Sequence, residues 1–379
     1  MAYDNIVIAG HGVAGLTAGD TLRRLGYQGR LTVIGEETHT TYSRPALSKA
    51  ALAPGAEMDV NFLPEPTHGA DALLGHTATG LDVANSTLTT SDGAVILYDG
   101  LVIATGAQAR RFTDSPNELT LRSLDDAVRL KGRLTETSKV TVIGGGPLGM
   151  EVASGALNLG CETTLIHAGV PMSAHIGPFL SARLSEAARE AGLIIVDGFV
   201  SGVEETAAGM LATLADGRTF TSEIIITAAG DIPNDSWLAD SGLLVDGRLV
   251  TDTRCRVHEN IVACGDVAWI GGAGGPRRTP IWTAAVEQGK AAATALLRGD
   301  EAPELDFQNY FWTDQWGVNV KISGPIPRGL EPEIVKGSLT DRSFVAYWPE
   351  ENAAAAYNMR TPIPKLHTIA RGGATVPAS

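Results

Sequence analysis

Two glycine clusters in this chain have the spacing that brings a polypeptide backbone close to a phosphate group. Both follow the pattern GxGxxG, with Gly10, Gly12 and Gly15 in the first cluster and Gly144, Gly146 and Gly149 in the second. When such a cluster joins a strand to a helix, its glycines let the backbone approach a pyrophosphate, which the helix N-terminus attracts. The chemistry that these residues indicate is therefore the binding of dinucleotides.

The residues around the first cluster supply the expected strand, helix and acid. Residues 5–9 form a short apolar run, apolar residues then recur at helical spacing until Gly26, and residues 31–34 form a second apolar run. Glu36 lies just beyond that second strand, 21 residues after Gly15. Its carboxylate can accept hydrogen bonds from both ribose hydroxyls, so this cluster predicts a dinucleotide site.

The second cluster has the same frame without the acid. A strand over residues 140–143 precedes it, a helix runs through Leu159, and a strand over 163–166 follows, so the βαβ unit is duplicated within the chain. The position of the acid is taken by His167, whose neutral imidazole makes one hydrogen bond to a ribose hydroxyl. No arginine for a 2′-phosphate occurs between Glu162 and Arg183. The choice between NADH and NADPH stays open.

Between and after these units the sequence predicts short strands and a change of composition. Alternating strands are expected over 86–90 and 210–214, apolar strands that run into glycine over 101–104, 224–227 and 260–263, and an aromatic-rich segment begins near residue 305. We expect an α/β fold with two Rossmann-type domains plus a small α+β C-terminal domain. The expected boundaries are 1–108 with 236–305 for a discontinuous FAD-binding domain, 109–235 for an NAD(P)H-binding domain, and 306–379 for the C-terminal domain.

Composition excludes several other classes of protein. The 379 residues carry a formal net charge of −14, which disfavours nucleic acid and anionic membranes as partners. The first apolar stretch, residues 6–18, is interrupted by glycines and lacks a basic segment before it, and no run approaches the roughly 18 to 20 apolar residues of a membrane span. We expect a cytoplasmic protein.

Cysteine usage excludes one group of flavoenzymes. The three cysteines, Cys161, Cys255 and Cys264, form no CxxC pair and no metal-ligand cluster. We expect buried free thiols, and hence no dithiol-disulfide reductase activity. The eight histidines are scattered and form no HExxH motif, so no metal site is predicted.

Several longer motifs carry a resemblance to a known family. They are Thr41–Lys49 (TYSRPALSK), Ala104-Thr-Gly106, Leu121–Ala127, Gly230–Asn234, Cys264-Gly-Asp266, Ala285–Gly289 and Phe311–Gln315. Together they resemble the NAD(P)H-dependent ferredoxin reductases of bacterial oxygenase and cytochrome P450 systems, over most of the chain. The resemblance implies a glutathione-reductase-like fold, bound FAD, NADH or NADPH as electron donor, and a ferredoxin-type iron-sulfur protein as acceptor.

The resemblance also implies roles for individual residues. Lys49 would lie beside flavin N5 and pair with Glu151, Trp282 would lie near the isoalloxazine, and Asp266 would bond a ribitol hydroxyl. The ADP half of FAD would contact Gly10, Gly12, Gly15 and Glu36, with Ala78 at the adenine, and Arg44, Thr105, Gly106 and Arg122 would hold the pyrophosphate and its surroundings. Val13, Ala14, Ala104 and Gly265 would be further cofactor-binding positions. The pyridine nucleotide would contact Gly144, Gly146, Pro147, Leu148, Gly149, His167 and Gly230.

Four side chains in or near these motifs also have a simpler structural interpretation. Lys49 could be a solvated surface charge, and Glu151 could be a favourable charge near a helix N-terminus. Trp282 and Trp312 could be core aromatics. The family motif around each residue is the reason to prefer the functional interpretation.

Departures from the family pattern leave other functions open. His167 replaces the usual acid, Pro280 stands where these reductases tend to carry a glutamate, and the C-terminal domain is short. We predict a reductase that passes electrons from NAD(P)H through FAD to a ferredoxin, as a monomer or homodimer. The alternatives are a flavin oxidase or another biosynthetic flavoenzyme with reduced use of pyridine nucleotide, and a non-catalytic redox sensor.

Overall fold

The computed structural model describes residues 3–55, 62–134, 139–329 and 331–373. The chain forms two compact units, each assembled from separate stretches of sequence. The first consists of Met1–Ser43, Asn61–Gln108 and Ile232–Phe307, and the second of Arg44–Val60, Ala109–Asp231 and Gln308–Ser379. The division into three domains predicted above stays a prediction.

The first unit is built on a six-stranded sheet with the strand order β19-β20-β7-β1-β2-β3. Every neighbouring pair in it is parallel except β19 with β20. The strands are β1 (Asn5–Ala9), β2 (Arg30–Gly35), β3 (Asp71–Leu74), β7 (Gly100–Ile103), β19 (Arg256–His258) and β20 (Ile261–Ala263). The apolar side chains of β1, β2, β7 and β20 are buried because both faces of the sheet are covered there, whereas Ala72 and Leu73 of the edge strand β3 are exposed.

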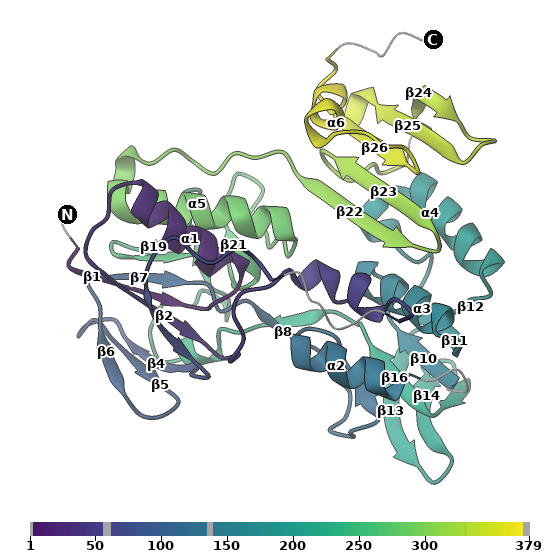
Figure 1. Cartoon of the computed structure of the whole chain (residues 1–379), viewed down its shortest axis with the longest axis horizontal. Helices are drawn as coiled ribbons and strands as arrows, with labels where there is room; N and C mark the ends of the chain where they lie inside the picture. Colours follow the sequence, from purple (N-terminus) through teal and green to yellow (C-terminus); the bar gives the residue numbers. More distant parts are fainter. Residues whose placement is uncertain (1–2, 56–61, 135–138, 330, 374–379) are drawn as a thin grey trace. The chain divides into compact units, whose positions relative to one another are not determined.

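Two helices and a small antiparallel sheet pack against the six-stranded sheet. Helices α1 (Val13–Arg24) and α5 (Trp282–Arg298) pack against each other and share one hydrophobic core with the large sheet. The antiparallel sheet of β4 (Ala78–Asp82), β5 (Thr87–Thr90) and β6 (Val95–Leu97) contributes to a second core around the same strands (Figure 1). A Cβ at Gly289 would lie 2.6 Å from the Ala14 carbonyl oxygen, so the close contact of α5 with α1 requires glycine there.

The second unit contains a five-stranded parallel sheet with the order β12-β11-β10-β16-β9. Its elements are β9 (Glu118–Leu119), α2 (Leu124–Arg133), β10 (Lys139–Ile143), α3 (Pro147–Asn158), β11 (Glu162–His167), α4 (Ser173–Glu190), β12 (Ile194–Asp197) and β16 (Ile224–Thr227). An antiparallel sheet packs on it, formed by β13 (Val200–Thr206), β14 (Gly209–Leu214) and β15 (Thr219–Ser222).

The C-terminal part of this unit is a five-stranded antiparallel sheet with the order β22-β23-β26-β25-β24. It comprises β22 (Tyr310–Gln315), β23 (Val318–Ser323), β24 (Glu333–Ser338), β25 (Ser343–Trp348) and β26 (Ala353–Tyr357), and helix α6 (Ile363–Ala370) packs on it. Four shorter strands in the described residues lie outside the sheets named above. They are β8 (Ala107–Ala109), β17 (Asp231–Pro233), β18 (Val250–Thr251) and β21 (Trp269–Ile270).

The predicted duplication is present in the backbone. Gly10 has φ +120° and a Cβ there would lie 2.1 Å from the Ala104 carbonyl oxygen, while Gly144 has φ +107° and a Cβ there would lie 2.3 Å from the Ala228 carbonyl oxygen. In both units the first glycine of the turn thus packs on the end of a neighbouring parallel strand, where no side chain fits. The predicted α/β class with two Rossmann-type units is confirmed.

Candidate functional site

The first glycine turn has the features of an anion site. Gly12 is the residue before α1, with no side-chain cap on the helix and no acidic residue in its first turn. A Cβ at Gly12 would meet nothing within 4 Å, so the space in front of the helix N-terminus is open. The N–H groups of the first turn therefore remain available to a phosphate, and this turn fits the pyrophosphate of FAD.

The predicted ribose and adenine residues lie beside this turn in the same unit. Glu36 follows the last residue of β2 and is exposed, and Gly10 N donates to the Ile34 carbonyl oxygen of that strand at 2.8 Å. Ala78 begins β4. Because β1 and β2 are parallel neighbours, the glycine turn and Glu36 share the carboxyl edge of the sheet, where nucleotides bind in this fold.

Thr105 has a structural partner that the sequence analysis did not identify. Its Oγ1 donates to the Asn234 carbonyl oxygen at 2.7 Å, and Asn234 Nδ2 donates to the Thr105 carbonyl oxygen at 3.0 Å. Asn234 N also donates to the Gly106 carbonyl oxygen at 3.0 Å. Asn234 thus fixes the turn after β7. Its place in the quoted motif Gly230–Asn234 was the only signal for this role.

The Asp266 turn is held by a buried glutamine. Gly265 N donates to Gln288 Oε1 at 2.8 Å, and the Gln288 side chain is 1% exposed. Asp266 itself is half-buried, and Trp282 is the half-buried first residue of α5. Gln288 orients the turn that carries Asp266, which explains why it belongs to the motif Ala285–Gly289.

Other predicted flavin residues belong to the second unit. Arg44 donates a hydrogen bond to the Arg122 carbonyl oxygen. The residue after Arg122 caps α2 in a capping box, in which Ser123 Oγ accepts from Asp126 N and the Asp126 carboxylate accepts from Ser123 N. The structure therefore brings Arg44 and Arg122 together and fixes the backbone beside them.

The predicted Lys49 to Glu151 ion pair is present. Lys49 Nζ lies 2.7 Å from Glu151 Oε2, although the two residues are 102 positions apart. Their side chains are 18% and 5% exposed, which excludes the interpretation of Lys49 as a solvated surface charge. Lys49 Nζ also donates to the Pro45 carbonyl oxygen at 3.2 Å, so the ammonium group is held by two acceptors.

Glu151 has two further donors, both hydroxyls. Ser48 Oγ donates to Oε2, and Thr313 Oγ1 donates to Oε1 at 2.6 Å. Thr313 accepts in turn from Gln315 Nε2 at 2.7 Å, and Gln315 Oε1 accepts from Trp316 Nε1 at 2.8 Å. A buried hydrogen-bonded chain, which we call the Glu151 network, thus runs from the lysine through Glu151 and Thr313 to β22.

Thr313 and Gln315 were quoted in a family motif but not predicted as site residues. Thr313 is 0% exposed and Gln315 is 4% exposed, so their polar groups need the partners that they have. Trp312, on the same strand, is half-buried and stacks on Tyr310 with ring centroids 5.8 Å apart. The contact supports the interpretation of Trp312 as a packing residue.

The second glycine turn repeats the geometry of the first. Gly146 precedes α3, Pro147 is the first residue of that helix, and the helix has neither a side-chain cap nor an acidic residue in its first turn. Proline fits this position because its missing N–H would have no intrahelical partner. The turn therefore fits a pyrophosphate as the first one does.

His167 lies at the end of β11, next to this turn, as the sequence predicted. A Cβ at Gly145 would lie 2.7 Å from the His167 ring, so glycine is required beneath it. Burial lowers the pKa of His167, and the nearby Asp197 opposes this effect. The imidazole is consequently neutral at neutral pH.

Asp197 is a charged neighbour that the sequence analysis missed. It ends β12, lies opposite His167 in the register of the parallel pair, and accepts a hydrogen bond from Gly169 N at 2.8 Å through Oδ1. Arg218 Nη2 donates to the Asp197 carbonyl oxygen at 2.6 Å and pairs with Asp216. The end of β11 is thus flanked by a carboxylate from the adjacent strand, which only the strand order reveals.

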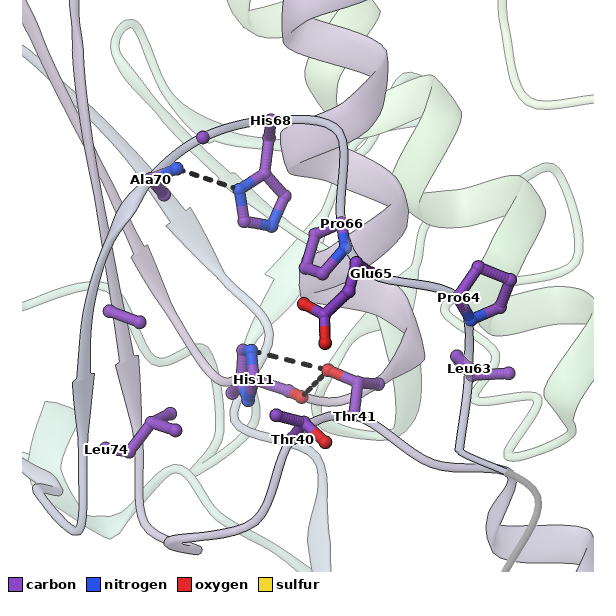
Figure 2. Close-up of a pocket in the computed structure, with 12 residues that line it drawn as sticks. His11, Thr40, Thr41, Leu63, Pro64, Glu65, Pro66, His68, Ala70 and Leu74 are labelled. Carbon is purple, nitrogen blue, oxygen red and sulfur yellow. Dashed lines mark hydrogen bonds between the residues drawn. The ribbon is translucent and has the colours of Figure 1, made fainter.

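A cavity of about 220 Å³ lies beside the first glycine turn (Figure 2). Thr41 Oγ1 donates to the His11 carbonyl oxygen at 3.0 Å, and His68 Nδ1 accepts from Ala70 N at 3.1 Å. The neutral His68 ring therefore carries its proton on Nε2, which has no partner among the described residues although the side chain is 5% exposed. Figure 2 shows the Glu65 carboxylate between the two histidine rings. No predicted site residue lines this cavity.

The cysteines do not form a redox pair. Cys161, Cys255 and Cys264 are free and buried. Burial raises the pKa of the Cys264 thiol to about 12 and raises that of Cys255 as well. Neither of these two thiols is ionised at neutral pH, so neither is the reactive thiolate that disulfide exchange requires.

Comparison with known proteins places the chain among flavin-linked reductases. A family model described as pyridine nucleotide-disulphide oxidoreductase matches residues 4–289. The 3-phenylpropionate/cinnamic acid dioxygenase ferredoxin–NAD(+) reductase component of Photorhabdus laumondii subsp. laumondii is 32% identical over 336 residues, covering 86% of this chain and 85% of the relative. The benzene 1,2-dioxygenase system ferredoxin–NAD(+) reductase subunit of Pseudomonas putida is 33% identical, covering 89% and 84%.

A solved structure agrees with these sequences. The chain is similar to the covalent putidaredoxin reductase–putidaredoxin complex, with a TM-score of 0.84 at 28% identity, covering 97% of this chain and 93% of the other. Within the described residues, no helix is both long and apolar enough to cross a membrane.

Proposed function

Since the chain belongs to the pyridine nucleotide-disulphide oxidoreductase family, we propose that it takes electrons from NAD(P)H and delivers them through bound FAD to a ferredoxin-type iron-sulfur protein. The observation that carries the proposal is the pair of matching glycine turns, each before a helix without cap or first-turn acid. Two dinucleotides can thus bind to one chain. The relatives named above are reductases of dioxygenase systems, so an oxygenase or cytochrome P450 system is the proposed destination of the electrons.

We assign the two dinucleotides to different parts of the chain. FAD belongs to the first turn, with Glu36 on its ribose and Asp266 on its ribitol, in a domain of residues 1–108 and 236–305. The pyridine nucleotide belongs to the second turn, in a domain of residues 109–235. When bound, FAD supplies the exchange between a two-electron donor and a one-electron acceptor, and the protein supplies position and electrostatics.

Lys49 is the proposed electrostatic residue at the flavin. The family resemblance assigns it to flavin N5, where its positive charge would stabilise negative charge on the reduced ring. Glu151 and the Pro45 carbonyl oxygen hold the ammonium group in one place, and the hydroxyls of Ser48 and Thr313 hold the carboxylate. A charge fixed in this way needs little reorganisation when electrons arrive.

The absence of a thiol step agrees with delivery of single electrons. Cys255 and Cys264 have raised pKa values and lack the CxxC spacing, so the two-electron disulfide chemistry in the family's name has no support here. Free thiols also support a cytoplasmic location, where thiols stay reduced, as part of the proposal. We propose that the reductase is a monomer or a homodimer, and sedimentation of the purified protein distinguishes the two.

The acceptor distinguishes the proposed reductase from an oxidase. Steady-state oxidation of NADH is measured with and without a [2Fe-2S] ferredoxin, with cytochrome c present to take one electron from each reduced ferredoxin, and peroxide formation by the reductase alone in air is followed in parallel. A ferredoxin reductase should oxidise NADH at least about tenfold faster with ferredoxin present and should form little peroxide when ferredoxin and cytochrome c are left out. Stoichiometric peroxide with no response to any ferredoxin would favour the oxidase alternative and contradict the proposal.

A further inference from the structure

The two glycine turns differ in the side chain that lies beside the second glycine of each cluster. A Cβ at Gly12 would meet nothing within 4 Å, whereas a Cβ at Gly146 would lie 3.5 Å from Cε1 and 3.9 Å from Nε2 of His175. Gly146 is the residue before α3, next to the free N–H groups that attract phosphate. An imidazole therefore stands at the phosphate end of the second turn, where the first turn is open.

Two backbone hydrogen bonds hold the segment that carries His175 next to the second glycine turn. Met172 N donates to the Gly145 carbonyl oxygen at 2.7 Å, with Met172 at φ +67°, and His175 N donates to the Met172 carbonyl oxygen at 2.8 Å. These bonds link the first turn of α4 directly to the glycine turn. The imidazole is thus carried by backbone that is itself bonded to the predicted phosphate site.

The other end of this short segment is fixed as well. Gly177 has φ +75° and ψ +166°, which interrupts α4, and Pro178 follows it. A Cβ at Gly177 would lie 2.0 Å from the Pro327 carbonyl oxygen, so the break packs tightly on the chain after β23. The first turn of α4 is therefore oriented separately from the rest of the helix. The backbone under His175 is therefore fixed, and its exposed side chain is accessible to a ligand.

We propose that the imidazole of His175 binds a phosphate group of the pyridine nucleotide, and that it does so as a cation. The inference rests on the proposed function, because it assumes that the second turn binds NAD(P)H. The phosphate is either the diphosphate common to both nucleotides or the 2′-phosphate of NADPH. Both are anions that a protonated imidazole can pair with through a charge-assisted hydrogen bond.

The charged groups around His175 make its protonation depend on the ligand. His175 is exposed at the surface, although its neighbours partly shield the imidazole from water, and this desolvation lowers the pKa of His175; the neighbouring His167 on β11 lowers it further. Asp197 acts on His167, and Arg218 bonds the Asp197 carbonyl oxygen and pairs with Asp216. Arg183 lies on α4 over the Phe179 ring, and Arg328, which follows Pro327, donates its N–H to Glu351. Among the described residues, no carboxylate forms an ion pair with His175.

The sign of the pH dependence follows from this arrangement. Without nucleotide, the imidazole of His175 is uncharged at pH 7.5. A bound phosphate raises the pKa of this imidazole because its negative charge stabilises the protonated form. Nucleotide binding thus takes up a proton. Affinity should be highest below the pKa of the free imidazole and should fall as the pH rises through the higher pKa of the complex.

The test is calorimetric titration of the purified holoprotein with three nonreacting ligands at pH 5.5, 6.5 and 7.5 and constant ionic strength. The ligands are adenosine, 5′-ADP and adenosine 2′,5′-bisphosphate. The variants are His175→Gln, which keeps a polar group of similar reach, and His258→Gln as a matched control at an exposed histidine of β19. Repeating each titration in buffers of different ionisation enthalpy counts the protons taken up.

We expect a phosphorylated ligand to bind wild type and His258→Gln about tenfold more tightly at pH 5.5 than at pH 7.5, equivalent to about 1.4 kcal/mol, with proton uptake. His175→Gln should lose most of this gain, while adenosine should show no dependence in any variant. Comparing variants with one ligand cancels titration of the ligand's own phosphate, which has a pKa of about 6. A gain with both phosphorylated ligands assigns His175 to the diphosphate, and a gain with the bisphosphate alone assigns it to the 2′-phosphate.

Two results would overturn the inference, and they are distinguishable. If phosphorylated ligands bind equally at all three pH values, or if His175→Gln keeps the full gain, His175 is not the phosphate ligand although the nucleotide site stands. If no adenine nucleotide binds wild type at any pH, the second turn is not a nucleotide site, and the proposed function fails with the inference.

Discussion

Replacing Thr313 by valine tests the Glu151 network in the second unit. The change keeps the shape of the side chain and removes the hydroxyl that donates to Glu151 Oε1 at 2.6 Å and accepts from Gln315 Nε2 at 2.7 Å. A hydrogen bond to a charged group contributes about 1.5 to 3 kcal/mol, and a buried amide left without its partner costs about 1 to 3 kcal/mol. Because all three side chains are at most 5% exposed, water cannot replace the lost bonds.

We therefore expect Thr313→Val to destabilise the protein by about 3 kcal/mol, which for a unit of 150 to 250 residues lowers Tm by roughly 6 to 12 °C. The assay is thermal unfolding of the FAD-loaded protein at pH 7.5, followed by near-UV circular dichroism. Thr313→Ser is the control, since it keeps the hydroxyl and removes one methyl group, at a cost of about 1 kcal/mol. A valine variant that melts within about 1 °C of wild type would refute the inference that this hydroxyl satisfies a buried carboxylate.

Four further outcomes are expected. Glu36→Ala should weaken FAD binding by about 1 to 3 kcal/mol, measured by flavin titration of the apoprotein, and unchanged affinity would exclude Glu36 as the ribose ligand. Lys49→Gln should slow flavin reduction more than it lowers FAD content, in stopped-flow absorbance against total flavin; a loss of FAD alone would indicate a structural role. His167→Glu should favour NADH over NADPH by about tenfold or more in the ratio of reduction efficiencies, since a carboxylate accepts from both ribose hydroxyls and repels a 2′-phosphate; a wild type that already prefers one nucleotide a hundredfold would contradict this account. Burial lowers the pKa of His11 and His68 below the ordinary 6.5, so the unfolded chain binds more protons near pH 6 and their contribution to stability should be lost as the pH falls below about 6.5. Tm at pH 7.5 and at pH 5.5 measures this loss of stability, and His68→Gln should make the difference in Tm between the two pH values smaller. An unchanged difference in that variant would show that other groups cause the loss.

The sequence predicted those parts of the site that depend on local backbone geometry. The first glycine turn and its acid could be predicted because strand, turn and helix are adjacent in sequence, and Glu36 stands at the end of β2 as expected. The ion pair of Lys49 with Glu151 joins residues 102 positions apart, so no periodicity indicated it. Only the family resemblance brought these two residues together.

Other residues of the second unit were not predictable because strand order or a helix break positions them. Asp197 reaches the end of β11 only because β12 is the parallel neighbour of that strand. His175 is eight positions beyond His167, and only the αL backbone at Met172 and the break at Gly177 turn it toward Gly146. The hydroxyl of Thr313 reaches Glu151 from β22, 162 positions away.

Anaerobic mixing of the purified yellow protein with NADH, and separately with NADPH, tests most directly that one chain carries both an FAD site and a pyridine nucleotide site. We predict that the absorbance of the oxidised flavin bleaches fully with about one equivalent of reduced nucleotide per FAD, and that it returns when about two equivalents of an oxidised [2Fe-2S] ferredoxin are added, because each ferredoxin accepts one electron. A protein that purifies without flavin, or whose flavin stays oxidised in excess NADH and NADPH but is reduced by dithionite, would contradict the account.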